Sequence, residues 1–197
     1  MSELLLLVMQ VPYLDAVVEE TLRCESVATF TVRRATCDTH VRGYHIPKGT
    51  DMMLCLAGPT LTRPAIAGSE KARPEVGSDD PGGVRAWDDR DITTYNPERW
   101  LRTETTRTGH AKIVFDQNAG PNLAFSCGRR QCFGKKQALL QLKMTITLLI
   151  WGCAFEPVEE PLNNEEITES LVNLPKNCYA RIRVLRQMTS DALSAAV

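Results

Sequence analysis

At residues 125–134 the sequence reads Phe125-Ser126-Cys127-Gly128-Arg129-Arg130-Gln131-Cys132-Phe133-Gly134, with the spacing F-x-x-G-x-R-x-C-x-G. This segment predicts a tight loop, because Gly128 and Gly134 permit backbone angles and close approaches that a Cβ would block. We expect a helix to follow from about residue 134 to residue 151, with the positive end of its dipole facing Cys132. That dipole and the cation of Arg130 would favour a thiolate at this position.

The decapeptide resembles the haem-binding signature of the cytochrome P450 family, in which a cysteine thiolate is the axial ligand of the iron. The resemblance implies that Cys132 ligates the iron of haem b, iron protoporphyrin IX. It also implies that Arg130 contacts a haem propionate, that Phe125 packs near the thiolate, and that Gly128 and Gly134 occupy the glycine positions of the signature. The competing interpretation, in which Cys132 is an ordinary small buried hydrophobe, is much weaker for a cysteine inside such a motif.

Composition excludes several other classes of protein. The 197 residues suffice for one domain with a sizeable core, and the net charge of −1 does not favour nucleic acid as a partner. The seven cysteines form an odd count without a C-x-x-C pair, so we expect most thiols to be reduced and buried rather than joined in a disulfide framework. Cys127 and Cys132 could form a metal pair, but no further ligands follow at zinc-like spacing. The three histidines are scattered, as surface or loop residues typically are.

A second motif lies far from the cysteine. Glu20 and Arg23 lie three residues apart on a predicted amphipathic helix over residues 14–24, where they could form only a weak surface ion pair. Residues 95–100 read Tyr-Asn-Pro-Glu-Arg-Trp. This order resembles the E-x-x-R helix of P450s and the later P-E-R-F-like segment, whose arginine joins the pair. The resemblance implies an enclosed structural network of Glu20, Arg23 and Arg99 that locks the cysteine loop.

Two further segments are candidates for a substrate pocket. In the P450 family the chain just after E-x-x-R passes over the haem, and a C-terminal hairpin dips into the same pocket. These features imply pocket roles for a small set of residues: Ala28, Thr29, Phe30, Leu171 and Val172.

The remaining sequence predicts local structure. Short strands are expected at residues 29–32, 39–41, 51–56, 171–174 and 179–185, with turns at residues 43–50. The range 68–86 is a probable surface loop insertion, and residues 103–110 are predicted to be polar and mobile. The apolar stripe of Leu139, Leu142, Ile146, Leu149 and Ile150 predicts a buried core helix within residues 138–155, with Gly152 as its expected stop. The apolar run at residues 4–9 is too short to cross a bilayer.

Together these patterns predict a mainly α fold with small β-sheets (α+β), corresponding to the C-terminal half of a fungal-like microsomal P450 and incomplete as such. One P450 region would occupy residues 1–197. No A-G-x-[DE]-T segment is present, so the acid–threonine helix of the family has no counterpart.

The first functional hypothesis is a haem-thiolate monooxygenase that uses O₂, a lipophilic small molecule and an NADPH-cytochrome P450 reductase-type electron donor. The resemblance implies that a full-length parent would lie on the cytoplasmic face of the endoplasmic reticulum membrane, and we expect no membrane anchor within these residues.

Two alternatives accompany that hypothesis. The first is a truncated haem-binding fragment without turnover, with no catalytic residue identifiable beyond the iron ligand. The second is a small structural or interaction domain without haem, which the ten-residue signature makes improbable.

Overall fold

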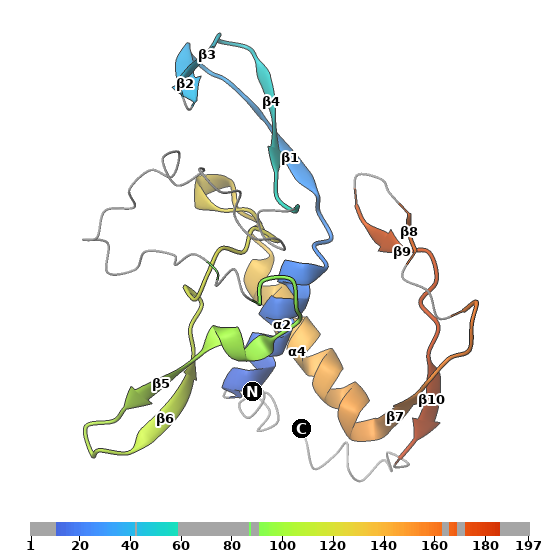
Figure 1. Cartoon of the computed structure of the whole chain (residues 1–197). Helices are drawn as coiled ribbons and strands as arrows, with labels where there is room; N and C mark the ends of the chain where they lie inside the picture. Colours follow the sequence, from blue (N-terminus) through green and yellow to red (C-terminus); the bar gives the residue numbers. More distant parts are fainter. Residues whose placement is uncertain are drawn as a thin grey trace.

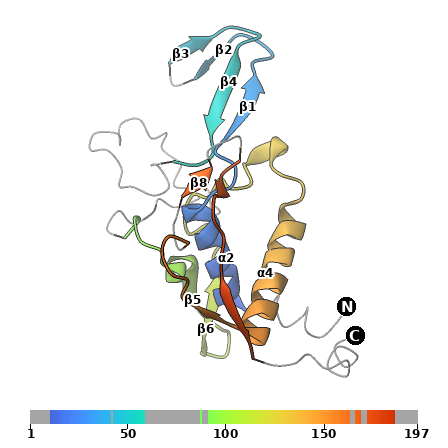
Figure 2. The ribbon, with the colours of Figure 1, turned by 90° about the vertical axis from the view of Figure 1, so that its right-hand side faces the viewer.

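The computed structural model describes residues 11–41, 43–58, 87, 91–162, 166–168 and 172–185. Two helices, α2 (Pro12–Cys24) and α4 (Lys135–Gly152), lie side by side at the centre, and small antiparallel sheets extend away from them (Figures 1 and 2). Two short 3-10 helices lie within the predicted site segments: η2 (Pro97–Trp100) contains Arg99, and η3 (Gly128–Arg130) contains Arg130. The layout places α2 between the segment that contains η2 and the loop that leads into α4.

The strands of the described residues form antiparallel pairs. The pairs are β1 (Phe30–Arg34) with β4 (Asp51–Cys55), β2 (Thr39–Val41) with β3 (Tyr44–Ile46), β5 (Leu101–Thr105) with β6 (Ala111–Phe115), β7 (Cys153–Glu156) with β10 (Arg181–Val184), and β8 (Ile167–Thr168) with β9 (Leu174–Pro175). Every sheet therefore has two strands, which gives little stability without packing against another element.

Helix α2 begins with Pro12 in its first turn, where a missing backbone N–H leaves no hydrogen bond unmade. Its buried positions combine small apolar side chains with charges: Ala16, Val18, Glu19, Glu20 and Arg23. A helix with charged residues on its buried face needs partners for each of them, and the surrounding segments supply these partners.

The hydrophobic core is small and aromatic. It joins Ala16 of α2 to Trp87, Ile92 and Trp100, and Trp100 is only 1% exposed. The rings of Trp87 and Trp100 pack edge to face with centroids 4.8 Å apart, a favourable geometry for aromatic pairs. This core ties α2 to η2 and supports the polar network described below.

The sequence predicted both helices and the strands β1, β2, β4 and β10 to within a few residues, its expected strand at 171–174 overlaps β9 only at Leu174, and it predicted no strand at β7 or β8. It missed β3, which was predicted to be a turn, and it was wrong about residues 103–110, where β5 and β6 pair across a turn that contains Gly109 at φ +82°. Helix α4 ends at Gly152, the stop that the sequence predicted, and residues 153–156 form β7, which pairs with β10, instead of continuing the helix to residue 155. In each case pairing with a distant or adjacent strand decided the structure.

The prediction that α4 is a buried core helix is wrong for this structure. No residue of α4 is buried, and the exposed fractions of Leu142, Leu149 and Ile150 are 38%, 39% and 66%. The physical reason is that α2 and β7 are the elements that contact α4 most, which leaves much of its apolar surface uncovered. The prediction of buried thiols is also wrong: all seven cysteines are unpaired, five are exposed, and Cys24 and Cys153 are half-buried.

Some predictions lie outside the described residues. These are the loop insertion at 68–86, the apolar run at 4–9, and Leu171. Across the ranges that the structure describes, none of the helices combines the length and hydrophobicity that crossing a bilayer requires.

Candidate functional site

The cysteine loop, residues 123–134, is a folded-back turn that delivers Cys132 to the start of α4. The backbone N–H of Cys132 donates to the carbonyl of Phe125 at 2.9 Å, and the N–H of Ser126 donates to the carbonyl of Leu123 at 2.7 Å. The N–H of Lys135 donates to the carbonyl of Cys132 at 3.3 Å. Cys132 thus lies between a closed turn and the N-terminus of an 18-residue helix, where backbone N–H groups favour an anion.

The two glycines of the loop have different roles. Gly128 has φ +71°, a backbone conformation that L side chains adopt only with strain. Gly134 has φ −79°, which any residue can adopt. A Cβ at Gly134 would lie 3.8 Å from the sulfur of Cys132, an ordinary contact within the protein. The sequence-based reason therefore holds for Gly128, whereas neither the backbone angle nor a contact among the described residues requires a glycine at position 134.

The side chains of the loop face solvent. Cys132 and Arg130 are exposed, and Phe133 is 103% exposed. Phe125 is half-buried, and the ammonium of Lys135 lies 5.9 Å from the centroid of its ring, within the range of a cation–π interaction. The loop therefore presents a soft sulfur ligand and a cation on an open surface, without a covering element among the described residues.

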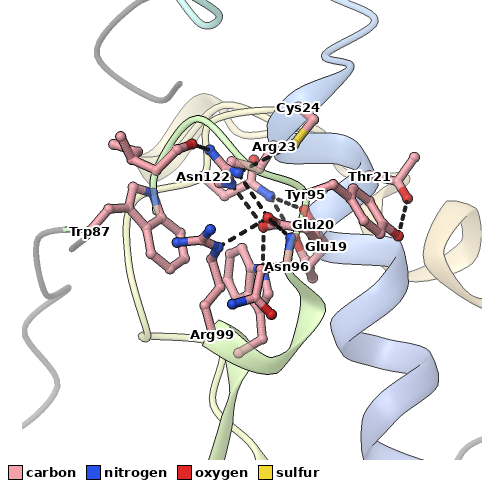
Figure 3. A network of polar contacts seen from close by, with 12 residues as sticks. Glu19, Glu20, Thr21, Arg23, Cys24, Trp87, Tyr95, Asn96, Arg99 and Asn122 are labelled. Carbon is pink, nitrogen blue, oxygen red and sulfur yellow. Dashed lines mark hydrogen bonds and ion pairs between the residues drawn. The ribbon is translucent and has the colours of Figure 1, made fainter. Parts of the chain in front are cut away.

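Glu20, Arg23 and Arg99 meet in the structure (Figure 3). The two oxygens of Glu20 accept from Nε and Nη2 of Arg23 at 2.8 Å each, and Oε1 also accepts from Nε of Arg99 at 3.0 Å. The side chains of Glu20 and Arg23 are 0% exposed, and that of Arg99 is 6% exposed. This is an enclosed network rather than the weak surface pair that was the alternative.

Further donors complete the coordination of the Glu20 carboxylate. The backbone N–H of Asn96 donates to Oε1 and the indole N–H of Trp100 donates to Oε2, each at 2.9 Å. Burial by itself would raise the pKa of Glu20, but the hydrogen bonds from Arg23, Asn96 and Trp100 outweigh it and lower that pKa. Glu20 is therefore held as a carboxylate at the centre of the network.

The two guanidinium groups also bind the connection that precedes η2. Arg23 donates to the carbonyls of Ile92 and Thr94 at 3.0 and 3.1 Å. Arg99 donates to the carboxylate and the carbonyl of Asp91 at 2.9 and 2.8 Å. The ring of Trp87 lies 5.7 Å from the guanidinium carbon of Arg23 and 5.4 Å from that of Arg99. The network thus fixes the path of residues 91–100 against α2.

A separate pair of contacts joins α2 to the cysteine loop and to α4. Oε2 of Glu19 accepts from the side-chain amide of Asn122 at 2.8 Å, and the carbonyl of Glu19 accepts from the same amide at 3.2 Å. One turn earlier, Asp15 accepts from the ammonium of Lys143 at 2.8 Å. Neighbouring positions of α2 therefore contact three parts of the chain: α4, the start of the cysteine loop, and residues 91–100.

The two predicted pocket segments also meet. Ala28 and Val172 form an isolated antiparallel bridge, and the N–H of Asn173 donates to the carbonyl of Val27 at 2.8 Å. A cavity of about 420 Å³ adjoins this junction and is lined by Glu25, Ser26, Val27, Ile167, Asn173 and Pro175. Thr29 and Phe30 continue from the junction into β1, and Leu171 lies outside the described residues. Ala28 and Val172 are chain neighbours of the lining residues Val27 and Asn173, but among the described residues the cavity lining does not include Ala28, Thr29, Phe30 or Val172.

Several residues of the site were not predicted from the sequence. Trp100, Asn96 and Asp91 all bind the network, and Asn122 joins Glu19 to the cysteine loop. The adjacency of Asn96 and Trp100 to Arg99 was a usable signal, because both flank a residue of the predicted network. Asn122 gave no such signal, since its partner lies more than a hundred residues away.

Comparison with known proteins identifies the family of this chain. The sequence model of the family described as Cytochrome P450 matches residues 6–60 and 91–181. The chain is 36% identical over 180 residues to the Hps1-dma1 cluster cytochrome P450 monooxygenase cyp3.1 of Dothistroma septosporum, covering 87% of this chain and 57% of that protein. It is 37% identical over 185 residues to the cytochrome P450 monooxygenase TRI13 of Fusarium sporotrichioides, covering 88% and 31%.

The fold is similar to that of solved haem domains. The crystal structure of the cytochrome P450DA heme domain superimposes with a TM-score of 0.62 at 23% identity, covering 91% of this chain and 32% of that one. Retinoic acid bound cyanobacterial CYP120A1 gives a TM-score of 0.59, covering 90% and 34%. The chain belongs to the cytochrome P450 family, whose mainly α fold with small sheets it shares in part. It spans 57% or less of the length of these relatives.

Proposed function

We propose that this chain provides the haem-thiolate part of a P450 monooxygenase, with Cys132 as the axial ligand of haem b. The observation that carries the proposal is the exposed sulfur of Cys132 on a closed turn at the start of α4. Bound haem would supply the iron that activates O₂ for insertion of one oxygen atom into a lipophilic organic substrate. An electron donor of the NADPH-cytochrome P450 reductase type would be required, and the endoplasmic reticulum is the proposed location of a full-length protein.

The residues of the loop suit this cofactor chemically. A thiolate is a soft ligand appropriate to haem iron, and Arg130 offers a fixed cation for an anionic propionate. Gly128 permits the turn at φ +71°, and Gly134 caps the N-terminus of α4 two residues after the sulfur ligand. Phe125, held below Lys135, supplies an apolar surface near the ligand.

The Glu20 network acts in this proposal as a support rather than as a catalytic group. Arg23 and Arg99 are both bound to Glu20 and to backbone carbonyls, so no proton needs to move among them. Their role is to hold residues 91–100 against α2, from which Glu19 reaches the cysteine loop. The junction of Ala28 with Val172 supports a substrate-binding role for Ala28, Thr29, Phe30, Leu171 and Val172.

A second candidate function is haem binding without turnover. It is favoured by the exposure of Phe133 and of the apolar face of α4, because an open site admits water, and water promotes side reactions of reactive intermediates. Under this candidate, Cys132 still binds haem, but electrons taken from a donor are not coupled to product.

The experiment that separates the candidates uses this chain reconstituted with haem, a purified reductase and a panel of lipophilic substrates. Electron-donor oxidation is measured alongside hydroxylated product. Product near one molecule per two electrons would establish monooxygenation by this chain. Haem uptake with donor oxidation and no product would establish the second candidate, and failure to bind haem would contradict both.

A further inference from the structure

The contact between Glu19 and Asn122 is a buried polar link that is separate from the network around Glu20. Glu19 is 9% exposed, and its carboxylate accepts from the Asn122 side chain at 2.8 Å. The carbonyl of Glu19 accepts from the same amide nitrogen at 3.2 Å. Asn122 therefore satisfies both a side chain and a main-chain acceptor of α2 with one donor group.

The other end of the Asn122 side chain shapes the entry to the cysteine loop. Its Oδ1 accepts from the backbone N–H of Ala124 at 3.0 Å, which closes a local turn of the kind that asparagine favours. Phe125 follows directly, and its carbonyl accepts from the N–H of Cys132. One amide side chain thus connects α2 with the backbone that holds the cysteine.

The Glu19 carboxylate lies in an unfavourable electrostatic environment. Burial raises the pKa of Glu19, Lys135 of α4 and the Asn122 amide oppose that rise, and Asp15 on the same helix face adds to it. A buried carboxylate without its own guanidinium partner among these neighbours is costly. Lys135 in turn lies against the ring of Phe125 at 5.9 Å, so the electrostatic neighbours of Glu19 also adjoin the loop.

We propose that Glu19 is a positioning residue that orders the cysteine loop through Asn122, independently of the Glu20 network. The proposal depends on the proposed function in one respect: the ordered loop is taken to present Cys132 to haem. Loss of the contact should free residues 123–132 to open locally while the core around Trp100 stays folded. Hydrogen bonds to charged groups change local equilibria by about ten- to a hundredfold, so amide exchange in the loop should accelerate by at least about tenfold.

The sharpest test uses Asn122→Asp in the haem-free full chain. Aspartate retains an oxygen for the N–H of Ala124 but places a carboxylate opposite Glu19. Glu19→Gln should then rescue Asn122→Asp in part, because the glutamine amide can donate to the new carboxylate while the carbonyl of residue 19 still lacks its donor. Glu98→Gln, at an exposed position of η2, is the matched control and should leave exchange unchanged. Hydrogen–deuterium exchange of residues 123–132 is measured for each variant, with tryptophan fluorescence reporting the core.

We expect fast loop exchange in Asn122→Asp, clearly slower exchange in the double variant, and unchanged core fluorescence in both. Wild-type exchange in Asn122→Asp, or equally fast exchange in the double variant, would overturn the proposal. If Asn122→Asp does not fold, the double variant decides: a folded chain with a protected loop supports the contact, and an unfolded chain overturns it. Haem titration of the same variants is read separately, so that failure of the wild-type chain to bind haem would contradict only the proposed function.

Discussion

Trp100 donates its indole N–H to Oε2 of Glu20 at 2.9 Å, although the two residues lie eighty positions apart and both are almost completely buried. This one hydrogen bond links the aromatic core to the ionic network. Trp100 packs against Trp87 on one side and completes the coordination of a carboxylate on the other. Packing and polar satisfaction therefore depend on the same side chain.

The first prediction concerns that bond. Trp100→Phe keeps an aromatic ring in the core but removes the donor to Glu20, which leaves an unsatisfied lone pair on a buried carboxylate. We expect the free energy of unfolding to fall by about 1–3 kcal/mol from the lost donor, with a further loss from the smaller ring. Urea unfolding followed by far-UV circular dichroism measures this change, and an unchanged midpoint would contradict the role given to Trp100.

The second prediction is that Glu20, Arg23 and Arg99 act as one unit. Alanine at Glu20 or Arg99 leaves charges buried without their partner, and we expect each single change to cost roughly 3–5 kcal/mol. The double change should cost far less than the sum. Arg102→Ala is the control, because the Arg102–Glu104 pair is about half exposed and should contribute less than about 1 kcal/mol. Additive losses for Glu20 and Arg99 would show that the two do not interact.

The sequence predicted the site residues that belong to motifs of fixed spacing, but not those whose roles depend on distant contacts. The cysteine loop and the trio of Glu20, Arg23 and Arg99 are marked by residue types at fixed spacing. Trp87 and Asn122 are not, because their roles arise from contacts with segments far away in the chain. The apolar stripe of α4 correctly predicted a helix but not its exposure, since periodicity identifies an apolar face without identifying what covers it.

The third prediction concerns Gly120, which no sequence pattern distinguished. A Cβ built at this position would lie 2.4 Å from the ring of Trp87, a distance that requires the indole or the backbone to shift. We expect Gly120→Ala to destabilise the chain by about 1–3 kcal/mol through overpacking. Gly152→Ala is the control, because nothing lies within 4 Å of the new Cβ. Equal thermal midpoints for the two variants would contradict the predicted close packing.

The fourth prediction concerns pH and Glu19. Burial raises the pKa of Glu19 above its ordinary value, despite the opposing effects of Lys135 and Asn122. At pH values between the unfolded and folded pKa of Glu19, the folded chain binds more protons than the unfolded chain. The contribution of Glu19 to the free energy of unfolding is therefore largest below the unfolded pKa and is lost as the pH rises through the folded pKa. Glutamine keeps the acceptor for Asn122 but does not titrate.

Glu19→Gln should therefore gain stability relative to the wild-type chain as pH rises through that window. Urea unfolding of both chains at a series of pH values measures the difference. A difference that is constant across the series, or that changes in the opposite direction, would contradict the direction of the shift.

The measurement that tests the central claim most directly is the ferrous–CO spectrum of the haem-reconstituted chain and its Cys132→Ser variant. Serine keeps the size of the side chain but removes the soft thiolate. We predict a thiolate-type Soret band for the wild-type chain, its loss in Cys132→Ser, and its retention in Cys127→Ala, where an exposed neighbouring thiol is removed instead. A thiolate-type band that survives in Cys132→Ser would contradict the assignment of Cys132 as the iron ligand.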